Sequence, residues 1–321
     1  MPVERQRIRQ IVEDYFLIKH FDMLKLDSYR DNNYHIILDS GQEYVLKISH
    51  PHESAEKLEL ENKAMILLRR NGVPAPEIMP NKHSNLLSYF RDDEGRTYFM
   101  RLIRFLSGDI LAKTEHTNEL FFNIGVFLAD VDSKLKFLDS IAAQRYIKWD
   151  LRHTLDSKVH LDLIKDPVKR YKTDYFFLQF ETHVRDQLHR LRNGLIYNDA
   201  NDYNLFIRDN KICGIIDFGD MVHSCLIFEV AIACFYIMLK KDDPLSAAVE
   251  LVKGYHSKKA LEEIELDLLY YLIAARLCIS VCSSAKARSE NPENSYINVT
   301  EDDAWRLLDQ LIELNPRRAQ N

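Results

Sequence analysis

The sequence predicts an α+β protein with two lobes, a small one built on an antiparallel sheet and a larger, mainly helical one. Strand-like segments and turn signals are concentrated in the first hundred residues. Helical periodicity dominates from Ser107-Gly108 to the C-terminus. We therefore expect an N-terminal lobe over residues 1–104 and a C-terminal lobe over residues 105–321.

Two strand pairs are expected in the first lobe. Tyr34–Leu38 and Glu43–Ser49 read as strands because the turn signal Asp39-Ser40-Gly41 separates them. A second pair is expected around Leu86–Phe90 and Thr97–Ile103. Short strands joined by tight turns form antiparallel sheets, which gives the small lobe its architecture.

A helix should lie between these two strand pairs. Its apolar side chains recur at the spacing of one helical face, and they are Leu60, Ala64, Leu67 and Leu68. Asn71-Gly72, followed by two prolines, ends the pattern.

Composition excludes several classes of protein. With 46% hydrophobic residues among 321, the chain can build a core and is not disordered. Its 43 basic and 49 acidic residues give a net charge of −6 without a basic patch, so no nucleic acid partner is expected. Only nine glycines occur, and no glycine-rich phosphate loop is visible.

The sequence also favours a cytoplasmic protein with no membrane partner. Met1–Arg9 has no apolar core of a secretory signal. The apolar stretch Cys225–Leu239 is interrupted by Glu229 and is too short for a bilayer, so we expect a buried core helix. The five cysteines lack paired spacings; Cys278 and Cys282 could face a metal, but buried thiols are the preferred interpretation.

One lysine in the first lobe requires a partner. Lys47 lies between Leu46 and Ile48, on the opposite face of the strand from both. Glu61 in the following helix could hold its ammonium group, with Glu59 as a competing partner. An edge-strand lysine facing water is the alternative.

Three oxygen-bearing side chains define the strongest motif. Two short apolar strands around the polar turn Arg208–Lys211 predict a hairpin, whose pairing should bring Asn204 and Asp217 close together. Asp199 precedes them in the connecting loop. Such a set suits Mg²⁺, which takes one or two carboxylates together with substrate phosphates.

The spacing of these residues resembles a known pattern. Asn204 follows Asp199 by five residues, and Asp217 follows Asn204 by thirteen. This order resembles the D-x-x-x-x-N and D-F-G motifs of the protein-kinase-like fold. Together with Lys47 and Glu61, it is similar to the aminoglycoside phosphotransferase and choline kinase branch of that superfamily.

A closer resemblance covers nearly the whole chain. The segments Asn198–Asn204, Ile216–His223 and Trp149–Arg152 are similar to the group that includes hydroxylysine kinases and the kinase modules fused to class III aminotransferases. It begins at Tyr29–Tyr34, a polar turn in place of a glycine-rich loop, and continues through Ala275-Arg276 to the last helix. The resemblance also implies a possible functional link to an aminotransferase.

The resemblance implies roles for the motif residues in the C-terminal, catalytic and substrate-binding lobe. Asp199 would accept the proton of the substrate hydroxyl or orient it for in-line attack. Asn204 and Asp217 would hold Mg²⁺. Glu229 would anchor the catalytic loop from the next helix.

The N-terminal lobe would then bind the nucleotide. Lys47, steadied by Glu61, would contact the α- and β-phosphates, and Leu102–Leu106 would form the interlobe hinge. The polar turn would cover the phosphates with backbone N–H groups, and its residues are Arg30, Asp31, Asn32 and Asn33.

The segment after the last motif indicates a small acceptor. About five residues separate Gly219 from the next helix and no A-P-E motif follows, so no peptide-docking segment fits. A small cationic alcohol is expected, whose ammonium group could meet Asp220 or the pair Trp149 and Asp150. Trp149 could instead be a core anchor.

The sequence thus predicts a kinase that transfers the γ-phosphate of ATP or GTP to a hydroxyl of a small amine or amino acid. Hydroxylysine-, ethanolamine- and homoserine-like acceptors are all compatible with it. Tyr197 stands where relatives usually carry histidine, so a catalytically weak, nucleotide-binding regulatory pseudokinase is an alternative. An aminoglycoside phosphotransferase is a further alternative.

Overall fold

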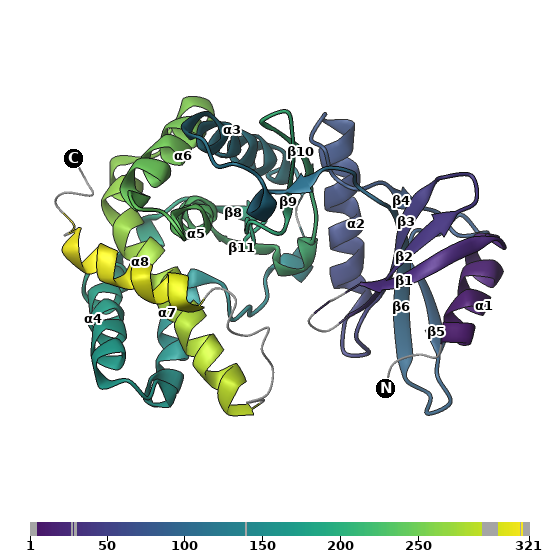
Figure 1. The fold of residues 1–321 in the computed structure, drawn as a ribbon, viewed down its shortest axis with the longest axis horizontal. Coiled ribbons are helices and arrows are strands. Elements are labelled where there is room, and N and C mark those ends of the chain that lie inside the picture. Colours follow the sequence, from purple (N-terminus) through teal and green to yellow (C-terminus); the bar gives the residue numbers. More distant parts are fainter. Residues whose placement is uncertain are drawn as a thin grey trace. The chain divides into compact units, whose positions relative to one another are not determined.

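The computed structural model describes residues 5–26, 28, 31–138, 140–290, 301–314 and 316 (Figure 1). It divides into two compact units. The smaller unit comprises Met1–Gly108 and Gly214–Gly219, and the larger comprises Asp109–Cys213 and Asp220–Asn321. A single boundary in the sequence does not describe this division, because residues 214–219 return to the smaller unit.

The smaller unit is built on an antiparallel sheet, as the sequence predicts. Its strand order is β1-β2-β3-β6-β4, with β5 paired to β6. The strands are β1 (Phe21–Leu26), β2 (Asn32–Leu38), β3 (Glu43–Ile48), β4 (Ile78–Met79), β5 (Ser88–Arg91) and β6 (Thr97–Arg104). Burial alternates along β3, so every second side chain enters the core. The expected strand pairs are confirmed, with ends shifted by one or two residues.

Two helices accompany this sheet. α2 (Ala55–Arg70) begins where the Ser54 side chain accepts a hydrogen bond from the backbone N–H of Lys57, and it ends at Asn71. α1 (Arg5–Phe16) was not expected from the sequence. It has three buried side chains, which join the core of the sheet, and they are Ile8, Ile11 and Val12.

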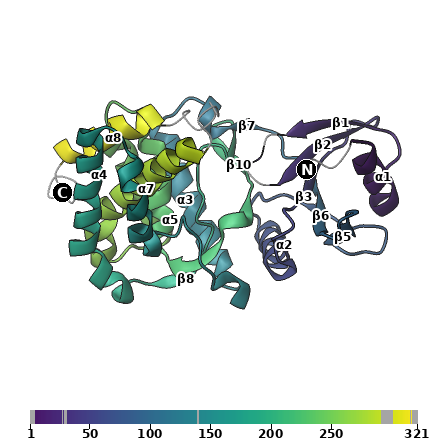
Figure 2. The ribbon, with the colours of Figure 1, turned by 90° about the horizontal axis from the view of Figure 1, so that it is seen from below.

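The larger unit is mainly helical. Its α-helices are α3 (Asn118–Leu135), α4 (Pro167–His183), α5 (Ile227–Met238), α6 (Pro244–Lys258), α7 (Glu263–Glu290) and α8 (Glu301–Glu313). The 3₁₀ segments are η1 (Leu111–Lys113), η2 (Ile141–Ala143), η3 (Leu151–Leu163), η4 (Arg185–Arg190) and η5 (Phe218–Asp220), the last of which reaches this unit only with Asp220. Figure 2 shows α7 between α4 and α5, and it packs against both.

Short strands frame the loop that carries the motif residues. They are β7 (Asp109–Ile110), β8 (Asn193–Ile196), β9 (Leu205–Arg208), β10 (Lys211–Ile215) and β11 (Val222–Cys225). β9 lies between β10 and β7, and β11 pairs with β8. The turn from β9 to β10 contains only Asp209 and Asn210, both with positive φ (50° and 58°), so it is tighter than the predicted four-residue turn.

Two glycines allow α3 and α6 to touch through their backbones. A Cβ at Gly125 would lie 2.0 Å from the carbonyl oxygen of Leu251, and one at Gly254 would lie 2.0 Å from that of Phe122. The Tyr255 hydroxyl, next to the second glycine, donates to Asp132 of α3 at 2.6 Å. These two helices therefore pack more closely than side chains at either position would permit.

The most apolar helices form the core of the larger unit. α5 is buried along almost its whole length, which confirms the buried helix expected in the stretch Cys225–Leu239. α7 is long and apolar enough to cross a membrane, but 72% of its most apolar window is buried inside the protein. Four of the five cysteines are buried and all five are free. α7 is thus a core helix, and the thiols contribute to packing.

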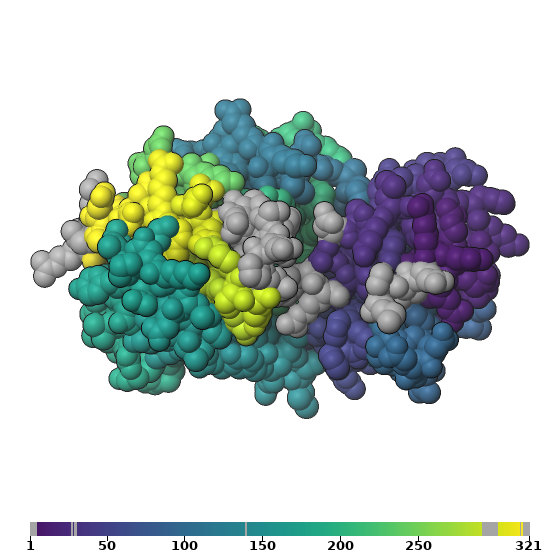
Figure 3. All heavy atoms as spheres, turned by 60° about the horizontal axis from the view of Figure 1, so that its bottom comes forward, coloured from purple at the N-terminus to yellow at the C-terminus, as the bar shows by residue number. Residues whose placement is uncertain are grey.

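The C-terminal helix α8 covers part of this core. Figure 3 shows it in yellow beside the teal surface of α4. Lys172 of α4 pairs with Asp309 of α8 at 2.6 Å, and the Tyr270 hydroxyl of α7 donates to the carbonyl oxygen of Leu311 at 2.6 Å. These contacts tie α8 to two neighbouring helices.

Candidate functional site

The smaller unit brings Lys47 and Asp217 together. The ammonium nitrogen of Lys47 lies 3.5 Å from Oδ1 of Asp217. Burial by itself lowers the pKa of Lys47, but the carboxylates of Asp217, Glu61 and Asp31 outweigh it, so the pKa is raised overall. Lys47 in turn lowers the pKa of Asp217. Both groups are therefore charged at neutral pH.

Glu61 has a different direct partner from the one the sequence suggested. Its carboxylate accepts a hydrogen bond from Nη2 of Arg101 at 2.7 Å, and Nη1 of the same arginine donates to Asn62 at 3.1 Å. All three side chains are buried. The expected direct pairing of Lys47 with Glu61 is wrong, because Arg101 lies opposite Lys47 on the neighbouring strand and takes the carboxylate. The sequence signal for this partner is Arg101 itself, a charged residue within the apolar run of β6.

The polar turn expected to cover phosphates is only partly a turn. Asn32 and Asn33 belong to β2 and pair with Ile48 and Lys47 of β3, so the strand takes up residues that were expected to form a loop. Asp31 precedes them, and its carboxylate accepts the backbone N–H of His50 at 3.1 Å. Burial raises the pKa of Asp31, although the ammonium group of Lys47 acts to lower it. Arg30 lies outside the residues that the structure describes.

In the larger unit, Asp199 and Asn204 face each other across the motif loop. The side-chain amide nitrogen of Asn204 donates to Oδ2 of Asp199 at 2.7 Å and to its backbone oxygen at 3.1 Å. Asn201 donates to Oδ1 of Asp199 at 3.0 Å. Because the Asn204 nitrogen is used in this way, its amide oxygen is the atom that can ligate a cation.

A buried acid holds the start of this loop. Oε2 of Glu229 accepts the backbone N–H of Asn198 at 2.7 Å and also that of Tyr197. Asn198 has a φ of 67°, a left-handed conformation that such contacts must stabilise. Burial, reinforced by the nearby Asp132, raises the pKa of Glu229 well above its ordinary value. The expected anchoring by Glu229 is confirmed, and the Tyr197 side chain is fully buried.

The donor atoms for a metal are of the right kind. Asp217, which also has a left-handed backbone (φ 61°), offers an ionised carboxylate, and Asn204 offers an amide oxygen. The described residues contain no group of three or more His, Cys, Asp or Glu that could hold a metal alone.

The residues expected to meet a substrate ammonium group behave differently from one another. Both carboxylate oxygens of Asp150 are engaged, since Oδ1 accepts from Ser224 at 2.7 Å and Oδ2 accepts from Arg152 at 2.7 Å. The ring of Trp149 already faces two protein cations, Lys148 at 4.3 Å and Arg276 at 4.6 Å. The structure therefore does not favour this pair as an ammonium site.

Asp220 lies beside the motif loop. Its backbone oxygen accepts from the side-chain amide of Asn198 at 3.2 Å. Its side chain is half-buried. It stays a candidate for substrate binding.

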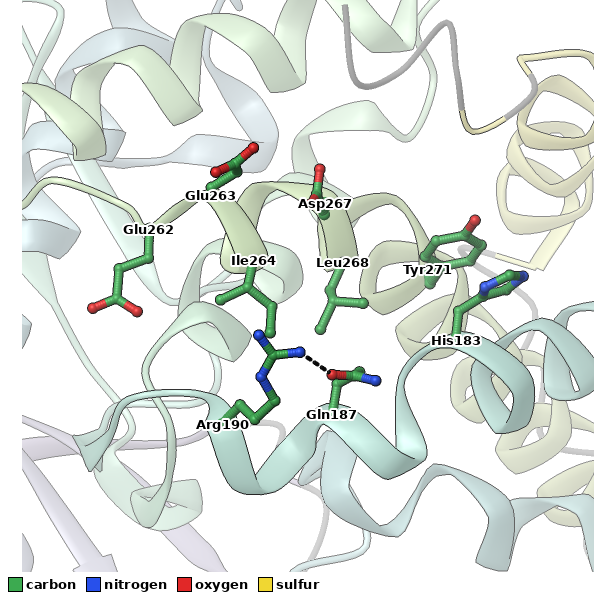
Figure 4. A pocket seen from close by; sticks show the side chains of 9 residues that line it. All are labelled: His183, Gln187, Arg190, Glu262, Glu263, Ile264, Asp267, Leu268 and Tyr271. Carbon is green, nitrogen blue, oxygen red and sulfur yellow. Dashed lines mark hydrogen bonds between the residues drawn. The ribbon is translucent and has the colours of Figure 1, made fainter.

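A groove of about 720 Å³ lies elsewhere on the larger unit (Figure 4). It is lined by His183, Gln187, Arg190, Glu262, Glu263, Ile264, Asp267, Leu268 and Tyr271, from α4, η4, α7 and the residue before α7. Arg190 donates to Gln187 of the same 3₁₀ segment at 2.7 Å. None of the site residues expected from the sequence lines it.

Comparison with curated proteins finds relatives that match most of the chain. The chain is 30% identical to a hydroxylysine kinase of Danio rerio, over 90% of this chain and 86% of that protein. It is 29% identical to a hydroxylysine kinase of Xenopus laevis, over 95% and 88% respectively.

Solved structures share the fold at low sequence identity. An amicoumacin kinase has a TM-score of 0.74 at 15% identity, with 98% of each chain covered. A microcompartment-associated aminopropanol kinase has a TM-score of 0.71 at 14% identity, with 98% of this chain and all of that chain covered. The two-lobed, protein-kinase-like fold expected from the sequence is confirmed.

The phosphotransferase enzyme family matches residues 23–265, which include Lys47, the Asp199 loop and Asp217. This span is well over half of the chain. The chain therefore belongs to the phosphotransferase enzyme family.

Proposed function

We propose that this protein transfers the γ-phosphate of a nucleoside triphosphate, ATP or GTP, to a hydroxyl of a small amine or amino acid, with Mg²⁺ as the metal. The observation that carries the proposal is the geometry of Asp199. Its carboxylate is held by the amides of Asn201 and Asn204, in a loop whose start is anchored on Glu229. A carboxylate fixed in this way is suited to orient a hydroxyl and accept its proton.

In the proposed reaction, the acceptor oxygen forms a bond to the γ-phosphorus as the bond to the β,γ-bridging oxygen breaks. The nucleoside diphosphate leaves with that bonding pair, and the hydroxyl proton passes to Asp199. The hydrogen bonds to both oxygens of Asp199 restrict its rotation, so the acceptor meets a preset base.

Three further residues would offset the negative charge of the nucleotide. Asn204 and Asp217 would hold Mg²⁺, which offsets negative charge on the phosphates when it is bound. Lys47 would contact the α- and β-phosphates. Its raised pKa supports this role, because the ammonium group stays charged at neutral pH.

Further observations support the class of acceptor and the location. The relatives are named hydroxylysine kinases, which supports a hydroxylated amine or amino acid as acceptor. Free, buried thiols suit a reducing compartment and support a cytoplasmic protein. A link to an aminotransferase rests on the resemblance in sequence alone.

Tyr197 motivates the second candidate, a catalytically weak regulatory protein. Its side chain is fully buried, at the position where the resemblance in sequence implies histidine. Replacement of Tyr197 by histidine separates the two candidates. Turnover that rises by orders of magnitude would favour the regulatory function, and unchanged turnover would favour the kinase.

The main test is release of nucleoside diphosphate in the presence of Mg²⁺. ATP and GTP are each assayed with hydroxylysine, homoserine, ethanolamine and an aminoglycoside, with Asp199→Asn as the inactive control. We expect turnover on one acceptor class that is lost in the control. Turnover on none of them, despite Mg²⁺-dependent nucleotide binding, would contradict the proposal.

A further inference from the structure

Arg276 is a buried arginine that the proposed mechanism does not use. It lies in α7, in the interior of the larger unit, and only 3% of its surface is exposed. Nη2 donates to the hydroxyl of Tyr236 at 2.8 Å. Within the part of the chain that the structure describes, Nε and Nη1 have no hydrogen-bond partner. A guanidinium removed from water normally pairs with an anion, so this one lacks the group that it would be expected to bind.

Aromatic rings surround the guanidinium. Its central carbon lies 4.6 Å from the ring centre of Trp149, 5.4 Å from that of Tyr236 and 5.6 Å from that of Phe235. Ring faces stabilise a positive charge, but they do not supply the oxygen acceptors that its N–H groups need. Phe235 is buried, whereas Trp149 and Tyr236 are only half-buried. We call these three rings the aromatic cage of Arg276. Trp149 and Tyr236 are therefore the two rings of the cage that can change position.

The cage adjoins the motif loop. Tyr236 and Glu229 are seven residues apart on α5, which places them on the same face two turns apart. Glu229 holds the backbone of the motif loop, and the carboxylates of Asp199, Asp202 and Asp220 act electrostatically on Tyr236. All these residues belong to the larger unit. An anion on Arg276 would thus bind a residue that is hydrogen-bonded to Tyr236, within electrostatic range of the acidic residues of the motif loop.

We propose that Arg276 binds the carboxylate of the acceptor, so that the substrate is a hydroxylated amino acid rather than an amine without a carboxylate. This inference rests on the proposed function and narrows it. Arginine carries five N–H donors in a planar fork that fits the two oxygens of a carboxylate, and here only Nη2 is engaged. The Trp149 side chain covers the guanidinium until the acceptor enters. The acidic residues of the loop then face the ammonium and hydroxyl end of the same molecule.

The test uses acceptors in matched pairs that differ by one carboxylate. Homoserine is compared with its decarboxylated form, 3-amino-1-propanol. Hydroxylysine is compared with the hydroxylated diamine that its decarboxylation gives. For the wild-type protein we expect kcat/KM to be at least about 100-fold higher for the amino acid of the productive pair, because the amine leaves Arg276 unpaired. Equal use of both members of the pair would overturn the inference and leave the proposed function intact. Turnover on ethanolamine but on neither pair would likewise overturn the inference alone, whereas turnover on no acceptor of the whole panel would reject the proposed function and this inference together.

Arg276→Lys tests the residue itself. It keeps the charge and loses the fork, so kcat/KM for the amino acid should fall about 100-fold, mainly through KM, while the value for the amine stays within about threefold. Arg192→Lys is the matched control, since Arg192 lies in the same unit and is already paired with Glu265. Thermal unfolding checks that both variants fold. Equal loss on amino acid and amine would assign Arg276 a purely structural role and refute the inference.

A binding measurement does not depend on turnover or on the variant's activity. The chain has two tryptophans, so Trp305→Phe leaves Trp149 as the single fluorophore. Homoserine and hydroxylysine should change its emission when they displace the ring from Arg276, whereas the decarboxylated partners should not. An identical response to both members of a pair would refute carboxylate recognition at this site.

Discussion

Replacement of Asp132 by asparagine should stabilise the protein, and increasingly so as pH rises. Asp132 is 1% exposed in α3, and its Oδ2 accepts from the Tyr255 hydroxyl at 2.6 Å. Burial, opposed by the nearby Lys259, raises the pKa of Asp132 to about 6 from an ordinary value of 3.8. The folded protein therefore holds this proton more tightly than the unfolded chain does.

The magnitude follows from the difference between the two pKa values. Between pH 3.8 and 6 the unfolded chain loses the proton while the folded protein keeps it, so the folded state loses stability as pH increases. The full shift is about two pKa units, or about 3 kcal/mol, and it is reached above pH 6. Asparagine has no proton to lose and can still accept from Tyr255. The free energy of unfolding of the Asp132→Asn variant, relative to that of the wild type, should therefore increase by about 1.4 kcal/mol between pH 5 and pH 7.5.

Glu229 strengthens the effect in the same direction. Asp132 is one of the causes that raise the pKa of Glu229, so its replacement also makes ionisation of Glu229 less costly. The stabilisation measured at neutral pH therefore includes a contribution from the second acid.

Urea unfolding followed by circular dichroism, at pH 5 and pH 7.5, measures these free energies. Asp130→Asn is the control, because Asp130 lies in the same helix but is half-exposed and forms a surface ion pair with Lys134 at 3.2 Å. Such a pair contributes at most about 1 kcal/mol, so the control should change little with pH. The reasoning is refuted if the advantage of Asp132→Asn is constant across this range or decreases as pH rises.

Three further changes should have distinct effects. Lys47→Met should lower kcat/KM for the nucleotide roughly 100-fold, because it removes a charge proposed to meet phosphates, whereas Lys57→Met, which removes a partly buried pair with Glu53, should not. Arg101→Met should lower the free energy of unfolding by about 3–5 kcal/mol, since it leaves the Glu61 carboxylate buried without its cation; a loss below 1 kcal/mol in urea unfolding would contradict this. Gly125→Ala should cost about 3 kcal/mol by the same assay, because the added methyl group meets the backbone of α6, and an unchanged midpoint would show that the helices can separate freely.

Local sequence signals predicted the elements that depend on neighbours in the chain. The strand pair before residue 50 was visible because the turn at Gly41, with a φ of 80°, needs a residue tolerant of that conformation. The helix α2 was visible from its apolar face. α1 was missed because it is short and strongly charged, and only its packing on the sheet buries its three apolar side chains.

Partner choice within the site could not be read in the same way. The sequence placed Lys47 and Glu61 in the smaller lobe, yet strand register decides that Arg101 lies beside Lys47 and takes the acid. Likewise, Asp150 looked available as a polar residue beside a tryptophan, but Arg152 and Ser224 occupy its oxygens. The residue types of a site follow from sequence spacing, whereas their pairing depends on contacts between distant segments.

The glycine contact between α3 and α6 has a consequence for how the larger unit opens. Because the two helices meet through their backbones and through the bond from Tyr255 to Asp132, they should unfold as one cooperative segment. Amide hydrogens on both helices would then exchange at one common, slow rate. Asp132, which raises the pKa of Glu229, belongs to this slowly exchanging segment. The surroundings of Glu229, which holds the motif loop, would therefore stay folded when peripheral elements unfold locally.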